Sequence, residues 1–282
     1  MTGKNEIDLR LLTPKGISYD YEILNQSKNE TYLFSFISIV RNGQTHLREC
    51  IDSIKNQNFK NYEVVFVDDN SNDDSLEILA QNIDTNWTLI RAQSNIGRAG
   101  ARNLAVKYAK GAYLVVQDAD DLSDENRLKY LNNIIEKAIL PIDVIAGQIK
   151  LISETGKIGF TEKIPFNELE LKSLLTRGEM PIAHPATCIK RSSFLVVGGY
   201  PDYARAQDLG LFMKLKDGNY YLDSKIHAYY RRKLFIPYET YKTSRICVNQ
   251  IKYDYLGLSP QKVNFFTWIL SETKRFTRSI VK

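Results

Sequence analysis

From residue 34 onward, apolar positions form short continuous runs that alternate with segments of helical periodicity. The runs have the length of buried strands: Phe34–Val40, Glu63–Val67, Trp87–Ala92 and Ala112–Val116. The segments between and after them place apolar residues three or four positions apart and predict helices: Gln44–Gln57, Ser75–Gln81, Gly97–Ala109 and Ser123–Ala138, the last capped by Ser123. Strands that alternate with helices favour right-handed crossovers. The pattern therefore predicts an α/β fold with a mainly parallel central sheet flanked by helices.

The second half of the chain has a more mixed pattern. It predicts three further strands, over Val144–Ser153, Thr187–Lys190 and Ile226–Arg231. It also predicts helices over Phe166–Thr176, Arg191–Val197, Leu209–Lys216 (starting at Asp208) and Tyr238–Tyr255. Neither a repeat nor a linker rich in Pro, Gly or Ser divides the chain, so we expect one domain over residues 33–256. Residues 1–32 lack periodicity and are expected to be an N-terminal extension, either a docking arm or a disordered lead.

The C-terminal tail, residues 257–282, has a pattern of its own. On a helix, apolar residues share one face and basic residues share the other: Phe265, Ile269, Phe276 and Ile280 against Lys274, Arg278 and Lys282. Glu272 interrupts the apolar face. Such a basic amphipathic helix either lies on an anionic membrane surface or packs on the protein itself or a partner chain.

Composition and charge narrow the class of protein. The chain is 43% hydrophobic and 25% charged, as is usual for a globular protein, and its net charge of +5 permits acidic ligands without requiring nucleic acid. The three cysteines are scattered and lack metal-ligand spacing, which favours reduced thiols. No signal-peptide pattern and no apolar run of the ~20 residues of a spanning helix is present. We therefore expect a cytoplasmic protein, either free or peripheral on the inner face of the cell membrane, with no nucleic-acid partner.

The candidate chemistry is most concentrated in Asp118-Ala119-Asp120-Asp121, directly after the apolar run that ends at Val116. Side chains at i and i+2 of an extended chain point the same way, so Asp118 and Asp120 should lie side by side. Two such carboxylates repel unless a cation or a proton lies between them. Oxygen ligands suit Mg²⁺ or Mn²⁺, and such an ion could hold a diphosphate. The alternative is an acidic turn that caps the next helix.

Five stretches in this order resemble a family-2 glycosyltransferase of the GT-A fold, a Rossmann-like nucleotide-diphospho-sugar transferase. The resemblance covers about residues 34–256 and rests on Phe36–Asn42, Val67–Asp73, Asn95–Asn103, Gln117–Asp121 and Gln207–Leu209. Singly, each stretch is a weak signal. Their order and spacing together indicate the family.

The resemblance implies a donor site for a nucleotide-sugar, most simply a UDP-sugar. Its residues would be Val40, Asn42, Asp69, Asn95, Gly97, Arg98, Arg102, Asp118 and Ala119. Asp69 would accept a hydrogen bond from the uracil ring N–H, because a carboxylate is an acceptor only; Asp68 is the alternative. Both could instead cap the next helix. A helix start with two glycines and two arginines suits a diphosphate, although which arginine faces inward stays open.

The resemblance also implies the metal ligands and the catalytic base. Asp118 would contact the ribose or a metal-bound water, and Asp120 would ligate Mn²⁺ or Mg²⁺ directly. Asp208 would be the base of an inverting transfer, with Gln207 in a position where the family often has Glu. Asp208 could also be a helix cap. Acceptor-side residues would be His184, Gly199, Tyr200 and Gln207.

The chain departs from the family pattern at Lys233, where relatives often have a histidine that completes the metal sphere. Either water fills that position, His227 replaces it from a shifted register, or Lys233 contacts phosphate. The third protein ligand is therefore open.

The expected function is an inverting, metal-dependent glycosyltransferase of the hexosyltransferase type. It would move a sugar to a hydroxyl of a glycan or lipid-linked acceptor in surface polysaccharide synthesis. A sugar-phosphate nucleotidyltransferase is one alternative, but the loop Arg41–Gln44 lacks the basic run that such enzymes carry. A non-catalytic relative that binds a nucleotide or glycan as a partner subunit is another, and the intact Asp118, Asp120 and Asp208 argue against it.

Overall fold

The computed structural model describes residues 19–28, 31–162, 165, 167–232, 235–261 and 267–272. Its strands are β1 (Tyr21–Asn25), β2 (Tyr32–Val40), β3 (Tyr62–Asp68), β4 (Trp87–Ala92), β5 (Gly111–Asp118), β6 (Leu122–Ser123), β7 (Val144–Ile152), β8 (Ile158–Glu162), β9 (Thr187–Lys190) and β10 (Tyr220–Arg231). Its helices are α1 (Gln44–Lys55), α2 (Ser75–Asn82), α3 (Gly97–Tyr108), α4 (Arg127–Lys137), α5 (Glu168–Thr176), α6 (Arg191–Val196), α7 (Gln207–Lys214) and α8 (Tyr238–Leu256), with a short 3₁₀ helix over His184–Ala186.

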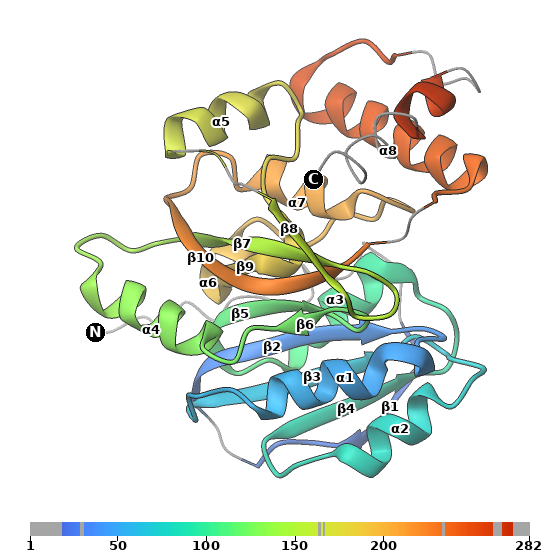
Figure 1. Cartoon of the computed structure of the whole chain (residues 1–282), viewed down its shortest axis with the longest axis vertical. Coiled ribbons are helices and arrows are strands. Elements are labelled where there is room, and N and C mark those ends of the chain that lie inside the picture. The colour runs from blue at the N-terminus through green and yellow to red at the C-terminus, as the bar shows by residue number, and fades with distance from the viewer. Residues whose placement is uncertain are drawn as a thin grey trace.

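A single sheet runs through the molecule in the order β1-β4-β3-β2-β5-β9-β7-β10-β6, and β8 pairs with β7 off this path (Figure 1). The run β4-β3-β2-β5 is parallel throughout, and β7 and β10 are parallel to each other. β9 is antiparallel to both of its neighbours and joins these two parts. The predicted α/β fold with a mainly parallel central sheet is confirmed.

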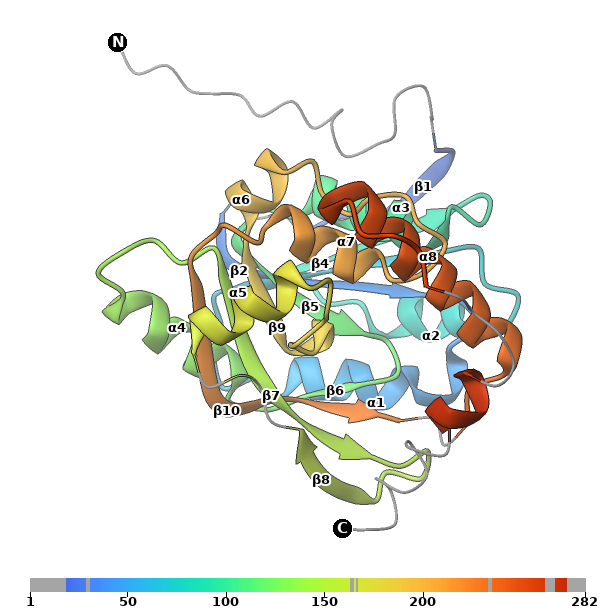
Figure 2. The ribbon, with the colours of Figure 1, turned by 90° about the horizontal axis from the view of Figure 1, so that it is seen from above.

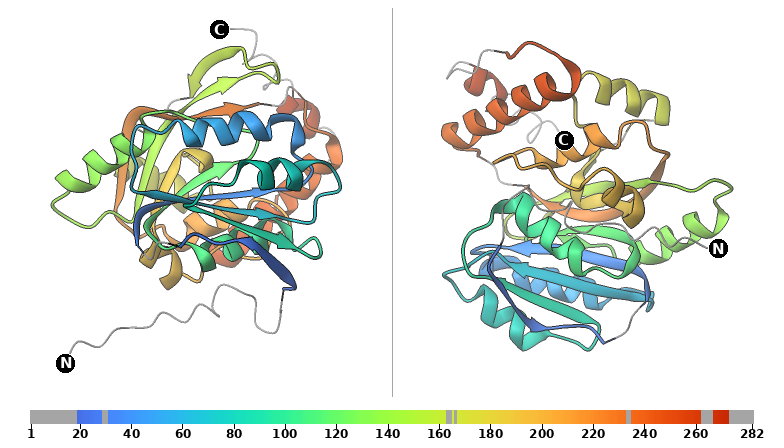
Figure 3. Two further views of the ribbon diagram at one scale, coloured as in Figure 1. Left: turned by 90° about the horizontal axis from the view of Figure 1, so that it is seen from below. Right: turned by 180° about the vertical axis from the view of Figure 1, so that it is seen from behind.

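Helices cover both faces of the sheet because the parallel strands are apolar on both sides. In β3, Val64 and Phe66 belong to the core beneath α1, α2 and α4, whereas Val65 and Val67 belong to the core beneath α3 and α5 to α8. Figure 2 and the rear view in Figure 3 show α1 and α2 on one side of the sheet and α3 on the other. Such two-sided burial is the physical reason for the continuous apolar runs in the sequence.

Register in the parallel run places several loops at one edge of the sheet. Val40 lies opposite Asp68, and Ile39 lies opposite Asp118, so β2, β3 and β5 end at the same level. Ligands of open α/β sheets bind beyond the carboxyl ends of such strands. The polar clusters found in the sequence therefore converge in space.

One prediction for local structure was incomplete, and one was wrong. Of the two alternatives for the N-terminal extension, the docking arm agrees with the described residues, but the sequence did not predict that Tyr21–Asn25 pairs antiparallel with β4 as the strand β1. Most of β1 is solvent-exposed and carries no alternating apolar pattern, so its sequence gives no strand signal. Ser123 does not cap a helix: it lies in β6, its N–H donates to Ser53 Oγ, and α4 begins only at Arg127. Tertiary hydrogen bonds override the local capping preference there.

Most of the predicted amphipathic tail, including residues 262–266 and 273–282, lies outside the described residues, as do residues 1–18. Residues 267–272 are helical and pack on the protein itself, since the Trp268 indole donates to the Ile236 oxygen at 3.0 Å and its ring lies 5.7 Å from that of Phe235. Within the described ranges, no helix is both long and apolar enough to cross a membrane. The three cysteines are buried and unpaired.

Candidate active site

The loops after β2 and β3 are joined by hydrogen bonds around Asn42. Its N–H donates to Ser71 Oγ at 3.0 Å, and its Oδ1 accepts from Asn72 N–H at 2.8 Å. Asn42 and Asn70 both adopt the left-handed region, with φ of 54° and 57°. Asparagine tolerates that conformation better than most residues. These hydrogen bonds therefore hold the two loops together beyond the buried end of β2 at Val40.

Asp69 joins the end of β3 to the start of α3. Its two carboxylate oxygens accept from the N–H groups of Ile96 and Gly97 at 2.7 and 3.1 Å, and Gly97 also donates to Asn95 Oδ1 at 3.0 Å. Burial raises the pKa of Asp69, although these two hydrogen bonds act in the opposite direction. Asp68, the alternative base reader, is equally buried and accepts from Ser71 N–H. Both oxygens of Asp69 thus accept hydrogen bonds from the start of α3. That Asp69 also binds the nucleotide base stays a prediction.

Asp118 is anchored by a buried arginine from α3. Arg102 Nη2 lies 2.7 Å from Asp118 Oδ1, and the Arg102 guanidinium lies over the Tyr200 ring, 5.7 Å from its centroid. Burial raises the pKa of Asp118, but the charge and hydrogen bond of Arg102, together with the nearby His184 and Arg98, outweigh burial and leave this pKa below its usual value. Asp118 is therefore ionised at neutral pH.

Two of the acceptor-side residues predicted from sequence, His184 and Tyr200, lie next to the Arg102–Asp118 ion pair. Tyr200 Oη lies 2.8 Å from His184 Nε2, and Asn103 binds both the N–H and the carbonyl of Tyr200 at 2.9 Å. Gly199, with φ of 64°, provides the turn that precedes Tyr200. Positive φ suits glycine, which explains the Gly-Gly pair. Tyr200 thus supports Arg102 and His184 from behind the site.

His184 should make the stability of the protein depend on pH. Burial, followed by the charge of Arg102, lowers the pKa of His184 to about 4, against an ordinary value of 6.5. Between these values the unfolded chain binds a proton that the folded chain does not, so stability is full above pH 6.5 and falls as pH decreases toward 4. The expected slope is at most about 1.4 kcal/mol per pH unit.

Urea unfolding at pH 7.0 and 5.0 tests this dependence. A His184→Gln variant, which can still bond to the Tyr200 hydroxyl, should lose less stability than the wild type between the two values. Equal losses in both proteins would contradict a neutral buried imidazole at this position.

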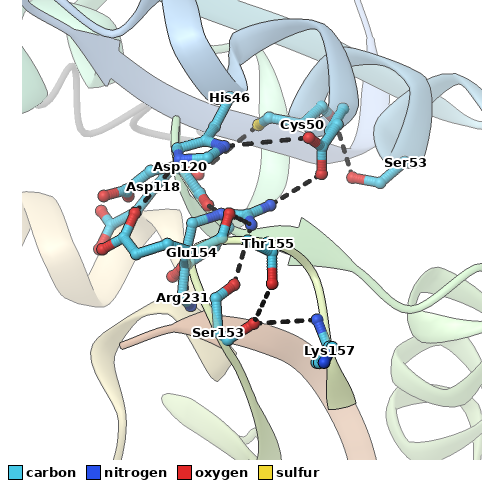
Figure 4. Close-up of polar contacts among 12 residues, drawn as sticks. His46, Cys50, Ser53, Asp118, Asp120, Ser153, Glu154, Thr155, Lys157 and Arg231 are labelled. Carbon is cyan, nitrogen blue, oxygen red and sulfur yellow. Dashed lines mark hydrogen bonds and ion pairs between the residues drawn. The ribbon is translucent and has the colours of Figure 1, made fainter. Parts of the chain in front are cut away.

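The acidic turn after β5 extends from Asp118 to Asp121. Figure 4 draws Asp118 and Asp120 on this turn, beside α1. Ala119 is buried, whereas Asp120 is half-buried. Asp121 is fully buried, and burial together with the charges of Asp118 and Asp120 raises its pKa strongly. Asp121 is therefore a structural member of the turn.

Asp118 and Asp208 open onto one cavity of ≈ 470 Å³. Arg98, Arg102, His184 and Gln207 also line it. The cavity thus combines cationic and anionic groups from four separate segments, which the resemblance assigns to donor and acceptor binding.

Asp208 lies in the first turn of α7. Its Oδ1 accepts from Leu209 N–H at 2.9 Å, so it contacts the helix start and the cavity at once. Ala206, just before it, has φ of 56°, an unfavourable conformation for a residue with a side chain. Gln207 is buried, and its Oε1 has no hydrogen-bond partner among the described residues. Strain and an unsatisfied acceptor at one point are typical of functional sites.

Several cavity residues were missed by sequence reasoning. They come from the second half of the chain: Met180, Ile182, Arg205, Tyr230, Ser244 and Val248. None lies in a motif, and α8 was predicted only as a helix. No local signal could have assigned them.

His227 does not complete a metal sphere. Its Nε2 lies 2.8 Å from Asp223 Oδ2, its ring is fully buried, and it lies 6.2 Å from the ring of Tyr130 on α4. In this structure the imidazole is therefore engaged with Asp223 and not with Asp118 or Asp120. Lys233 lies outside the described residues.

The donor chemistry of the acidic turn fits a divalent cation. Asp118 and Asp120 supply carboxylate oxygens, which Mg²⁺ and Mn²⁺ prefer. The described residues contain no group of three or more His, Cys, Asp or Glu side chains able to hold a metal ion. Mg²⁺ commonly takes one or two carboxylates and completes its sphere with water and substrate phosphates. The turn therefore suits a cation that binds together with a diphosphate.

The sheet topology and the position of the acidic turn define a GT-A-type α/β fold, which solved glycosyltransferase structures share. S. aureus TarS in complex with UDP-GlcNAc superposes with a TM-score of 0.62 at 21% identity, over 87% of this chain and 79% of that one. Mannosyltransferase PcManGT from Pyrobaculum calidifontis, in complex with GDP-Man and Mn²⁺, superposes with a TM-score of 0.61 at 16% identity, over 96% and 78%. Residues 35–195, more than half of the chain, match the model of glycosyl transferase family 2. The chain belongs to this family.

Curated relatives agree with this assignment. The chain is 31% identical over 157 residues to an uncharacterized glycosyltransferase of Haemophilus influenzae, covering 52% of this chain and 63% of that protein. It is 32% identical over 200 residues to the poly(ribitol-phosphate) beta-glucosyltransferase of Bacillus spizizenii, covering 68% and 30%. It is 29% identical over 143 residues to WfgD of Escherichia coli, a UDP-Glc:alpha-D-GlcNAc-diphosphoundecaprenol beta-1,3-glucosyltransferase, covering 50% and 56%. The matches span less than two thirds of the length of these relatives.

Proposed function

We propose that the protein transfers a sugar from a UDP-sugar to an acceptor hydroxyl with inversion at the anomeric carbon. The observation that carries this proposal is the single cavity onto which Asp118 and Asp208 open, with Arg98 and Arg102 in its lining. An inverting transfer needs a base on one face of the sugar and stabilisation of a leaving diphosphate on the other. The cavity contains side chains suited to both tasks.

Asp208 is the base in this proposal. Its carboxylate removes the proton from the acceptor hydroxyl as the hydroxyl oxygen attacks the anomeric carbon. The bond between that carbon and the diphosphate oxygen breaks, and its electron pair leaves with UDP. Arg98 and Arg102 donate hydrogen bonds that favour the charge that builds on the leaving group.

Asp118 and Asp120 would hold Mn²⁺ or Mg²⁺ when UDP is bound, and the cation would supply further charge stabilisation to the diphosphate. Arg102 keeps Asp118 ionised and oriented for this role. Asp69, at the β3 end of the same edge, would read the uracil N–H.

The donor and acceptor classes are proposed from the relatives. WfgD uses UDP-Glc and a lipid diphosphate acceptor, and TarS was crystallised with UDP-GlcNAc. The Bacillus spizizenii relative acts on poly(ribitol-phosphate). By analogy we propose a UDP-hexose donor and a glycan or lipid-linked acceptor of a surface polysaccharide, used at the inner face of the membrane.

A donor panel tests the proposal. Purified protein with Mn²⁺ is incubated with UDP-Glc, UDP-GlcNAc, UDP-Gal and GDP-Man, and release of nucleoside diphosphate is followed with and without glycan acceptors. We expect release from at least one UDP-sugar and no release from GDP-Man. Binding of UDP without turnover on any acceptor would favour a partner subunit instead, and release from GDP-Man alone would refute the UDP assignment.

A further inference from the structure

Arg231 at the end of β10 contacts three separate segments of the chain (Figure 4). Its side chain is only 2% exposed. Nε donates to the main-chain oxygen of Asp120 at 2.9 Å, and Nη2 donates to Glu49 Oε2 at 2.8 Å. Nη1 donates to the main-chain oxygens of Ser153 and Glu154 at 3.1 and 3.0 Å. All three guanidinium nitrogens are thus engaged within the protein.

The main chain of Arg231 makes a second attachment to the acidic turn. Its N–H donates to Asp121 Oδ1 at 2.7 Å, and Asp121 N–H donates to Asp118 O at 3.1 Å. Arg231 therefore binds the carbonyl of Asp120 and the side chain of the next residue. β10 thus holds the main chain of Asp120 and the side chain of Asp121 from more than a hundred residues away in sequence.

We propose that Arg231 is a positioning residue for nucleotide binding. It holds the turn from Asp118 to Asp121 so that the Asp118 and Asp120 carboxylates face the same cation-bound diphosphate. The inference rests on the proposed function, because it concerns how that site is held in shape.

Arg231 could have a simpler role, which is to hold the β7–β8 turn against α1. A second residue that joins the same two segments provides a control for this role. His46 on α1 lies with Nε2 3.4 Å from Glu154 Oε2 and with Nδ1 3.9 Å from Glu49 Oε1. His46 therefore links the same helix and hairpin as Arg231, through the same two glutamates. Its contacts with these glutamates do not involve the acidic turn.

Two variants separate these roles. Arg231→Lys keeps the positive charge but lacks the planar donors needed to reach four acceptors at once. His46→Gln weakens the link between α1 and the hairpin and leaves the hydrogen bonds of Arg231 to the acidic turn in place. Hydrogen–deuterium exchange of residues 118–124 is measured on ligand-free protein. Calorimetry measures UDP affinity in Mn²⁺ and in EDTA, and thermal unfolding is recorded for each variant.

We expect R231K to exchange faster at residues 118–124 and to bind UDP at least ten-fold more weakly in Mn²⁺, with unchanged affinity in EDTA. H46Q should match the wild type in exchange at residues 118–124 and in UDP affinity under both conditions. Unchanged exchange in R231K, or an equal loss of UDP affinity with and without Mn²⁺, would overturn the positioning role. A wild type that binds no UDP under either condition would overturn the proposed function, whereas the exchange result would still decide whether Arg231 holds the turn.

Discussion

Replacing Asp208 by asparagine should reduce sugar transfer by about 10³-fold while UDP affinity stays within a factor of two. Asparagine has the same shape, and its Oδ1 can still accept from Leu209 N–H, so α7 should begin as before. It cannot remove a proton from an acceptor hydroxyl. The rate of transfer and the UDP dissociation constant, measured on the same preparation, separate loss of the base from loss of the fold.

An exposed aspartate near the other end of α7 provides the matched control. Asp217 is 87% exposed and pairs only with its neighbour Lys216 among the described residues. Asp217→Asn should therefore leave transfer unchanged. If D208N keeps more than a tenth of wild-type activity, Asp208 is not the base, and its role is limited to the helix start.

The Arg102→Met substitution should weaken both the fold and the site. Arg102 is 8% exposed and paired at 2.7 Å with Asp118, whose side chain is 26% exposed. Removing one partner of a buried pair leaves an uncompensated charge. Because Asp118 is partly solvated, we expect a loss of about 2 kcal/mol in the free energy of unfolding, below the range for fully buried pairs. UDP affinity should fall by about 10–100-fold through loss of a charge-assisted donor.

A second substitution separates these two effects. In the Arg102→Met/Asp118→Asn double variant no unpaired carboxylate remains, so stability should recover most of the loss seen in R102M. UDP binding should not recover, because neither the cationic donor nor the carboxylate is restored. Recovery of UDP affinity in the double variant would show that Arg102 acts only on the fold.

The sequence predicted most elements of the domain because its strands are buried on both faces. Such strands appear as continuous apolar runs, and Trp87–Ala92 was predicted with the observed bounds. The strand β1 escaped notice because an exposed edge strand has no apolar pattern to detect. Ser123 was wrongly predicted to cap a helix because serine favours that position locally, whereas in the fold Ser123 pairs with β10.

The acidic turn and the start of α7 could be found because short motifs carry them. The sequence could not show that they meet in one cavity, because Asp118 and Asp208 are brought together only by the path of β9, α6 and the following turn. Arg205, Tyr230 and Ser244 lie in segments without a motif, and only packing of α7, β10 and α8 places them at the cavity. Arg231 ends a predicted strand, Ile226–Arg231, but its contacts with Asp120 and Glu49 depend on how β10 packs against the acidic turn and α1.

A crystal structure with UDP and Mn²⁺ tests most directly whether one cavity serves both halves of the reaction. We expect the diphosphate and the cation at the turn from Asp118 to Asp121, within reach of Arg98 or Arg102, and an open path from the β-phosphate to Asp208. A nucleotide bound away from this turn, or protein atoms filling the space between the β-phosphate and Asp208, would contradict the proposal.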